Sequence, residues 1–132
     1  MPRFSAASKA KLNTCHPDIQ RVMNHVIVGF DIKIIHGHRG QATQNKLFND
    51  GKSKLRYPLC KHNKTPSDAV DIAPYPVDWA DEERFVYLAG YVMGLAKMLD
   101  VNLRWGGDWD MDTETKDNRF RDLGHFERVS EK

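Results

Sequence analysis

The sequence has too little cysteine to be held together by disulfides or by a cysteine-rich metal site. It contains only Cys15 and Cys60, with no C-x-x-C pair that would indicate a zinc knuckle or a redox motif. We therefore expect two free thiols in a reducing compartment. The 132 residues must instead fold around a hydrophobic core, and this length is typical of one domain.

Long hydrophobic segments and a strong net charge are also absent. No stretch approaches the roughly 18 apolar residues that cross a bilayer, and the N-terminal segment lacks the continuous apolar region of a signal peptide. We expect a protein made in the cytoplasm without stable membrane association. The formal charge is only +2 and the Lys and Arg residues are scattered along the chain, which argues against a nucleic-acid partner.

Hydrophobic patterning predicts an α+β fold in which a few strands carry helices on one side. Pro17 indicates a helix start, and the β-branched residues of 31–36 indicate a strand. Asp78 is expected to cap the longest helix, with Asp81 and Glu82 in its first turn. The expected helices cover residues 5–12, 17–29, 42–49 and from 78 to about 99, and the expected strands cover 31–36, 69–73, 101–105 and 125–129, joined by polar loops over 52–67 and 106–122.

A carboxylate inside a predicted buried strand is the first candidate for chemistry. Asp71 lies in the apolar segment AVDIA, nine positions after His62, which lies in a polar loop. Burying a lone ionised carboxylate costs several kcal/mol unless a cation or hydrogen bonds meet it. A metal ion would satisfy Asp71, but so would a neighbouring loop that it caps or an arginine partner.

The segment DLGHFE near the C-terminus completes a possible metal site. Within it, His125 has carboxylates three positions before it and two positions after it. With His62 and Asp71 it gives two histidines and one carboxylate, a ligand set that catalytic zinc uses and that leaves a position for water. A structural zinc site would more often contain cysteine. Asp122 or Glu127 could accept the proton when water attacks a carbonyl.

Four motifs of this sequence together resemble those of the phage-type L-alanyl-D-glutamate endopeptidases. They are GHRG with a downstream glutamine, HNKTPSDAVDIAPYPVDW, WGGDW and DLGHFE, and they agree in type, order and spacing over roughly residues 15–128. The resemblance implies the hedgehog/DD-peptidase fold, which these enzymes share with D-alanyl-D-alanine carboxypeptidases: a small antiparallel sheet with helices packed on it. It also implies one zinc ion, hydrolysis of the L-alanyl-D-glutamate bond of bacterial peptidoglycan, and release from the host cytoplasm to reach the wall.

The same resemblance implies a role for each residue of the predicted site. Asp122 is the catalytic base, and Arg39 holds the substrate and the developing oxyanion. We expect residues 1–132 to form this single catalytic domain and to act as a monomer. The implied zinc ligands are His62, Asp71 and His125.

The sequence departs from the relatives at three points. Eight residues separate His62 from Asp71. The carboxypeptidases usually have a shorter spacing, so the longer spacing of this chain favours the phage endopeptidase branch. Asp122 stands where many relatives have glutamate, and Cys60 replaces a serine often found two positions before the first ligand. These changes bear on the geometry of the base and not on the metal.

The choice of the base also rests on a physical argument. If residues 125–127 are extended, His125 and Glu127 share a face, so Glu127 could reach the metal or hydrogen-bond to a ligand. Asp122 lies in the preceding loop, where its carboxylate can approach a bound water without replacing it. We favour Asp122, with Glu127 as the alternative or as a second contributor.

Four further residues close to these motifs have two possible roles each. Arg39 follows a predicted strand, where an exposed loop residue can lean over a pocket. Its guanidinium is suited to binding a substrate carboxylate or the charge of a tetrahedral intermediate. The alternative is that Arg39 forms a surface salt bridge. His36 and His38 form an H-x-H pair, but the ligand set is complete without them. Cys60 could bind zinc as a thiolate, although we interpret it as a bystander.

The WGGDW motif and the loop after it leave two more alternatives. We predict that Trp105 and Trp109 wall the cleft and contact substrate, with burial in the core as the alternative. Acidic residues alternate in the loop as in a calcium-binding loop, but the glycine and glutamate of that motif are missing. We interpret it as a solvated acidic loop, with a regulatory cation as the alternative. These residues are Asp108, Asp110, Asp112 and Glu114.

Three other functions fit part of the sequence. A D-alanyl-D-alanine carboxypeptidase would use the same chemistry on another bond. A hedgehog-like zinc domain would bind a partner without cleaving it, and the presence of Asp122 and Arg39 argues against that function. A metal-dependent nuclease would need a concentrated basic patch, which the scattered Lys and Arg residues do not form.

Overall fold

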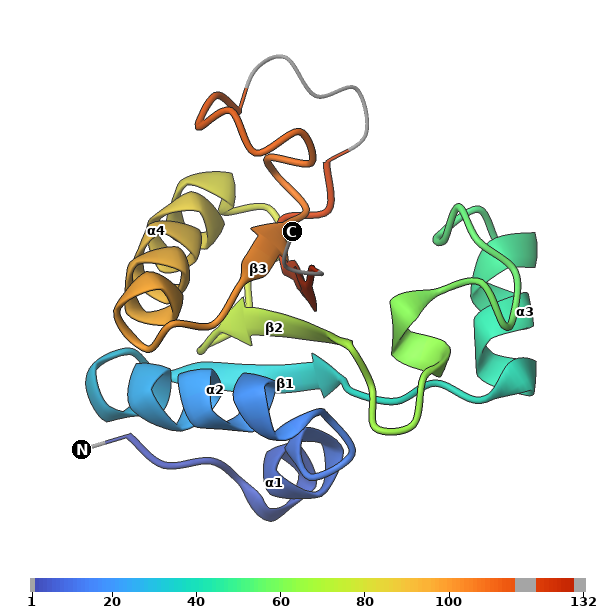
Figure 1. Cartoon of the computed structure of the whole chain (residues 1–132), viewed down its shortest axis with the longest axis horizontal. Helices are drawn as coiled ribbons and strands as arrows, with labels where there is room; N and C mark the ends of the chain where they lie inside the picture. The colour runs from blue at the N-terminus through green and yellow to red at the C-terminus, as the bar shows by residue number, and fades with distance from the viewer. Residues whose placement is uncertain (1, 116–120, 130–132) are drawn as a thin grey trace.

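The computed structural model describes residues 2–115 and 121–129, which form a four-stranded antiparallel sheet with helices beside it (Figure 1). The strand order is β1-β2-β4-β3, so β2 and β4 are central. The predicted α+β class is confirmed, although β3 is shorter than the expected 101–105. The elements are α1 (Ala6–Leu12), α2 (Pro17–Gly29), β1 (Ile32–His36), α3 (Gln41–Asn49), the 3₁₀ helix η1 (Lys61–Asn63), β2 (Ala69–Pro74), α4 (Glu82–Met98), β3 (Leu103–Trp105) and β4 (His125–Arg128).

Alternation along the two central strands separates a core face from a polar face. In β2, Val70 and Ile72 are fully buried in the hydrophobic core, so Asp71 between them points to the opposite face. In β4, Phe126 is fully buried in the same core, and the preceding His125 is paired in register with Asp71. The sheet therefore places two of the predicted metal ligands side by side, on the face away from the core.

Helices α2 and α4 pack on the core face, and α1 covers the free edge of β1. At that edge the backbone N–H of Ile34 donates to Oγ of Ser8 at 3.1 Å, which satisfies a donor of an edge strand. Helix α3 lies beyond the end of β1, beside η1 and apart from the other α-helices (Figure 1). None of the helices in the described residues is long and apolar enough to cross a membrane. The residues that α2 buries are Ile19, Val22, Met23, Val26 and Ile27.

The longest helix, α4, begins later than predicted. Its N-cap is Asp81, whose carboxylate accepts a hydrogen bond from the backbone N–H of Arg84 at 3.3 Å, and the helix starts at Glu82. The prediction that Asp78 is the N-cap is wrong, because its carboxylate accepts from the N–H of Ala80 at 3.0 Å in the preceding turn. Both aspartates satisfy a capping pattern, so the local sequence alone does not decide between them.

The polar segment 52–67 contains a short helix where we predicted a loop. The helix η1 is closed by the N–H of Cys60, which donates to Oδ1 of Asn63 at 3.0 Å, and the Asn63 amide donates to the carbonyl of Arg39 at 3.1 Å. This turn holds His62 completely buried. Both cysteines are unpaired, as predicted, and both are buried.

Candidate metal centre and cleft

Three side chains from separate elements converge on the polar face of the sheet. His62 comes from η1, Asp71 from the middle of β2 and His125 from the first position of β4. Oδ1 of Asp71 lies 2.9 Å from Nδ1 of His125 and 3.2 Å from Nε2 of His62, and these two nitrogens are 3.3 Å apart. Ligands about 2.0–2.1 Å from a tetrahedral zinc ion are roughly 3.3 Å from one another, so the cluster has the size of a zinc site.

Both histidines are oriented by a partner on their outer side. Nδ1 of His62 lies 2.7 Å from the carbonyl of Gly37, and Nε2 of His125 lies 2.8 Å from Oε1 of Glu127. These acceptors assign the N–H to the outer nitrogen of each ring. The inner nitrogens, Nε2 of His62 and Nδ1 of His125, are therefore the ones available to a metal.

The two carboxylate oxygens of Asp71 have different partners. Oδ1 faces the two histidines, while Oδ2 accepts from Arg39 and lies 3.4 Å from Nδ1 of His36. Burial opposes the ionisation of Asp71, but the nearby His62 and hydrogen bonds from His125 and His36 hold its pKa well below the usual range. Asp71 is thus an anionic carboxylate with one oxygen available to a metal and the other fixed by outer partners.

The two histidines differ in their affinity for a proton. Burial lowers the pKa of His62. Burial also opposes the charged form of His125, but hydrogen bonds to Asp71 and Glu127 outweigh it and raise its pKa to about 9. Without a metal at neutral pH, His62 is neutral and His125 carries a proton that a metal must displace.

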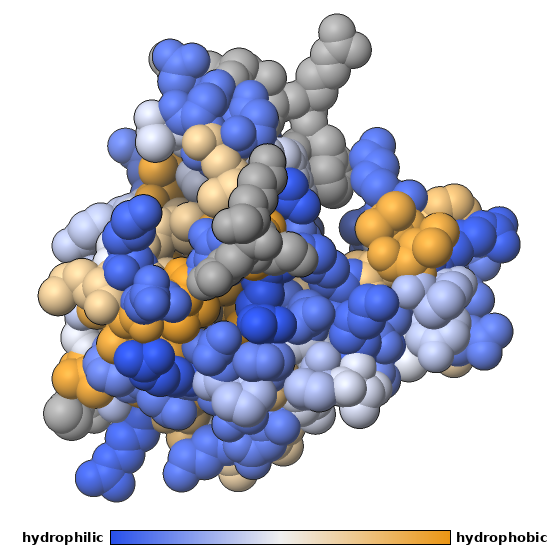
Figure 2. Space-filling model, viewed as in Figure 1, coloured by the Kyte–Doolittle hydropathy of each residue, from blue (hydrophilic) through white to orange (hydrophobic). Residues whose placement is uncertain are grey.

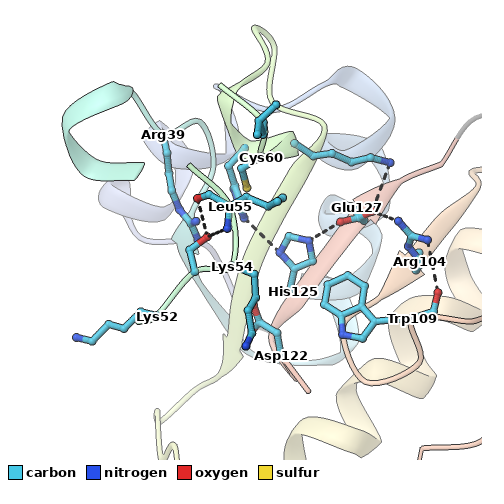
Figure 3. A pocket seen from close by; sticks show the side chains of 14 residues that line it. Arg39, Lys52, Lys54, Leu55, Cys60, Arg104, Trp109, Asp122, His125 and Glu127 are labelled. Carbon is cyan, nitrogen blue, oxygen red and sulfur yellow. Dashed lines mark hydrogen bonds and ion pairs between the residues drawn. The ribbon is translucent and has the colours of Figure 1, made fainter. Parts of the chain in front are cut away.

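A cavity of about 370 Å³ opens beside the cluster, and His62 and His125 line it together with Asp122 (Figure 3). Asp122 lies before β4, where its backbone N–H donates to the carbonyl of Gly106 at 2.8 Å. Burial and the negative charge of Asp71 raise the pKa of the Asp122 carboxyl. A carboxyl with a raised pKa inside a cleft is typical of a general acid or base.

The rim of the cleft on the α3 side combines exposed leucines with the basic side chains of Lys52 and Lys54. Leu55 and Leu59 line the cavity although they are 43% and 71% exposed. Figure 2 shows a hydrophobic patch on this lobe, and Figure 3 places Leu55 and Trp109 on either side of His125. The cleft therefore has leucines and lysines on one side and an aromatic ring on the other, which suits a chain-like substrate lying between them.

The cluster and cleft together have the chemistry of a catalytic metal site, because two histidines and one carboxylate leave a ligand position on the cavity side. A sequence profile of the family described as phage L-alanyl-D-glutamate peptidase matches residues 1–129. The chain belongs to this family. The L-alanyl-D-glutamate peptidase of Escherichia phage T5 is 31% identical to the peptidase over 135 residues, which cover 96% of this chain and 98% of the phage T5 protein.

The peptidase also shares its fold with a solved structure. The crystal structure of the L-Ala D-Glu endopeptidase ChiX from Serratia marcescens matches it with a TM-score of 0.76, covering 97% of this chain and 91% of ChiX. The two chains are 23% identical, so this likeness bears on the fold alone. It confirms the hedgehog/DD-peptidase-like fold that the motifs implied.

Arg39 of the peptidase is buried, so the prediction of an exposed loop residue is wrong. Its side chain forms an ion pair with Asp71 and donates to Oε1 of Gln44 at 3.2 Å, and the residue is 8% exposed. Gln44 is itself fully buried and donates to the carbonyl of Leu55 at 2.7 Å. Gln44 thereby connects Arg39 to Leu55 at the rim of the cleft, and these contacts account for the burial of Arg39.

Three other candidate ligands lie outside the His62, Asp71 and His125 cluster. Cys60 lines the cleft, and burial raises the pKa of its thiol, which keeps the sulfur protonated. His38 is exposed, and His36 contacts the outer oxygen of Asp71. We therefore keep all three out of the proposed ligand set.

The two tryptophans of WGGDW have different environments. Trp105 belongs to the hydrophobic core, and its indole N–H donates to the carbonyl of Leu123 at 2.8 Å. Because alternate residues of β3 face the core, the prediction that Trp105 contacts substrate conflicts with its burial. Trp109 lines the cleft, with its ring 5.5 Å from that of His125, so we keep the substrate-contacting role for Trp109 alone.

The acidic loop brings three carboxylates together at the surface. Oxygens of Asp108, Asp110 and Asp112 lie within 4.8 Å of one another. The Asp108 carboxylate accepts hydrogen bonds from the backbone N–H groups of Asp112 at 3.2 Å and Thr113 at 2.9 Å. These contacts make Asp108 a turn-capping residue, as expected for a solvated acidic loop.

Our sequence analysis missed four cations that line the cleft, Lys52, Lys54, Lys61 and Arg104, and two of them contact Glu127. Nζ of Lys61 lies 3.4 Å from Oε2 of Glu127, and a guanidinium nitrogen of Arg104 lies 2.6 Å from the same oxygen. Arg104 stands between two core-facing residues of β3, so strand alternation could have placed it on the polar face. The predicted shared face of His125 and Glu127 is confirmed, because their side chains are in contact at 2.8 Å.

Proposed function

We propose that this peptidase hydrolyses the L-alanyl-D-glutamate bond of peptidoglycan stem peptides with one zinc ion bound to His62, Asp71 and His125. The observation that carries the proposal is the convergence of three ligand atoms, 2.9–3.3 Å apart, at the wall of a cleft that also holds Asp122. The family and the name of the phage T5 relative support the choice of bond. We further propose that residues 1–132 act as one catalytic domain and as a monomer.

The chain's own residues supply proton transfer and charge stabilisation in this proposal. When bound, zinc supplies Lewis acidity, which polarises a carbonyl and acidifies water. Asp122 takes the proton of the attacking water and returns it to the amine that leaves. Arg39 binds the negative charge that develops on the carbonyl oxygen. Trp109 and the leucines of the opposite rim, Leu55 and Leu59, position the peptide between them.

The environment of Asp122 suits both of these proton transfers. A base with an ordinary aspartate pKa would hold the proton too weakly to carry it to the leaving amine at neutral pH. Burial and the charge of Asp71 raise the pKa of Asp122 toward neutrality, while His125 and Arg39 oppose the shift. Asp122 is therefore a stronger base than an exposed aspartate.

Digestion of purified peptidoglycan by the zinc-loaded peptidase is expected to create new D-glutamyl amino termini. Mass spectrometry of the released peptides detects these ends, and a sample treated with chelator is expected to show none. Release of free D-alanine would instead identify a carboxypeptidase. If neither new ends nor D-alanine appeared, the chain would be a zinc-binding domain without turnover.

Zinc binding is expected to be coupled to proton release, because His125 is protonated in the metal-free protein. At pH values below about 9, zinc must displace the proton on His125, so its apparent affinity rises as pH rises. With one proton displaced, the expected slope is about tenfold per pH unit, flattening above the pKa of His125. Calorimetric titrations in buffers of different ionisation enthalpy measure the released protons, and binding without proton release near neutral pH would contradict the assignment.

A further inference from the structure

Glu127 is a buried carboxylate on the polar face of the sheet, where it contacts His125 and two cations. It is only 7% exposed, and its two oxygens have different partners. Oε1 lies 2.8 Å from Nε2 of the proposed ligand His125, whereas Oε2 accepts from Arg104 at 2.6 Å and lies 3.4 Å from Nζ of Lys61. Two cations offset the burial of this carboxylate, which would otherwise be costly. Its orientation is therefore set on one side by the metal site and on the other by Arg104 and Lys61.

Arg104 contacts Trp109 in the wall of the cleft as well as Glu127. Its second terminal nitrogen lies 3.5 Å from the carbonyl of Trp109, and the centre of its guanidinium lies 5.8 Å from the centroid of the Trp109 ring (Figure 3). That ring is 5.5 Å from the ring of His125. A planar guanidinium can hold a carboxylate and stack on an aromatic ring at the same time, which a lysine cannot do. One side chain thus contacts both the outer partner of a metal ligand and the aromatic wall.

We propose that Glu127 and Arg104 are positioning residues that align the metal site with the substrate wall. Glu127 holds the His125 ring so that Nδ1 faces the metal, and Arg104 fixes both Glu127 and Trp109. The inference rests on the proposed function for its substrate part, because Trp109 contacts the peptide only if the cleft binds one. Its metal part rests on the contacts of Glu127 with His125 and Arg104 alone.

Glu127→Gln is the sharpest test of the metal part, because it keeps the size of the side chain. Glutamine has a single acceptor oxygen, so it cannot accept from both His125 and Arg104, and its NH₂ group must face one of these donors. We expect zinc affinity to fall by about 10–100-fold, the usual effect of removing the outer partner of a ligating histidine. Competition with a chromophoric chelator measures the affinity, and the visible spectrum of the cobalt(II)-substituted protein reports the ligand geometry.

Arg104→Met and Arg104→Lys separate the two contacts of Arg104. Both variants are expected to raise KM for stem peptides several-fold, because Arg104 no longer fixes the position of Trp109. The methionine variant is also expected to weaken zinc binding and shift the cobalt spectrum, whereas the lysine variant, which retains the charge beside Glu127, restores much of the zinc affinity. Arg128→Met is the matched control: Arg128 is 32% exposed against 34% for Arg104 and donates to Asp68 at 2.8 Å, and we expect it to change neither readout.

The outcomes separate this inference from the proposed function. If wild-type protein binds zinc but cleaves no stem peptide, the proposed function fails while the zinc affinities and cobalt spectra still test Glu127. Zinc affinity and a cobalt spectrum unchanged in Glu127→Gln would overturn the metal part. An unchanged KM in Arg104→Met, with active wild-type protein beside it, would overturn the substrate part.

Discussion

Asp122→Asn is expected to lower kcat on stem peptides by about 10²–10⁴-fold while zinc stays bound, which is the range expected for removing a general base. The side chain lines the cleft without belonging to the three-residue ligand cluster. Asparagine keeps the size of the side chain and the backbone hydrogen bond to Gly106, but its amide cannot accept the proton of water. The expected result is therefore a folded, zinc-loaded and nearly inactive protein.

Two measurements are needed to interpret the Asp122 variant. Zinc content after dialysis shows whether the metal remains, and steady-state rates on a defined stem peptide show the loss of turnover. Asp50→Asn is a suitable control, because Asp50 forms a surface ion pair with Lys46 on α3 and should affect neither quantity. Loss of zinc from Asp122→Asn would make Asp122 a ligand, and full activity would transfer the role of base to Glu127.

Local signals predict most of the fold and the positions of two members of the cluster, Asp71 and His125. The apolar segment around Asp71 predicts a buried strand, and period-two alternation then puts Asp71 on the face opposite Val70 and Ile72. The same alternation puts His125 and Glu127 on one face of β4. The motif resemblance then predicted that the loop histidine His62 lies beside these strands. Local patterning alone does not reveal this long-range contact.

The features that could not be predicted depend on contacts between distant parts of the chain. Arg39 looked exposed because the sequence does not show that Gln44 and Asp71 surround it. Trp105 and Trp109 are four positions apart and chemically alike, yet only the pairing of β3 with β4 decides which of them lies in the core. The contact between Arg104 and Glu127 likewise joins residues 23 positions apart. Such pairings follow from strand order, which local patterns do not encode.

His62→Ala is expected to have the largest effect on the metal site. His62 is completely buried, its inner nitrogen faces Asp71 and His125, and its outer nitrogen is held by the carbonyl of Gly37. Removal of a ligand should weaken zinc binding by more than the roughly 10–100-fold that follows loss of an outer partner. Activity should fall to that of the chelated wild-type protein, because the variant lacks one of the three proposed metal ligands.

Thermal unfolding with and without zinc distinguishes a lost ligand from a damaged fold. Free zinc at 100 times its Kd should stabilise wild-type protein by about 2.7 kcal/mol, and this increment should vanish in His62→Ala. His38→Ala is the matched control, since His38 is exposed and belongs to the H-x-H pair that we excluded from the ligand set. If His38→Ala kept the full zinc increment while His62→Ala lost it, the ligand set would include His62 and would not need His38. If the two variants behaved alike, the proposed set of His62, Asp71 and His125 would be wrong.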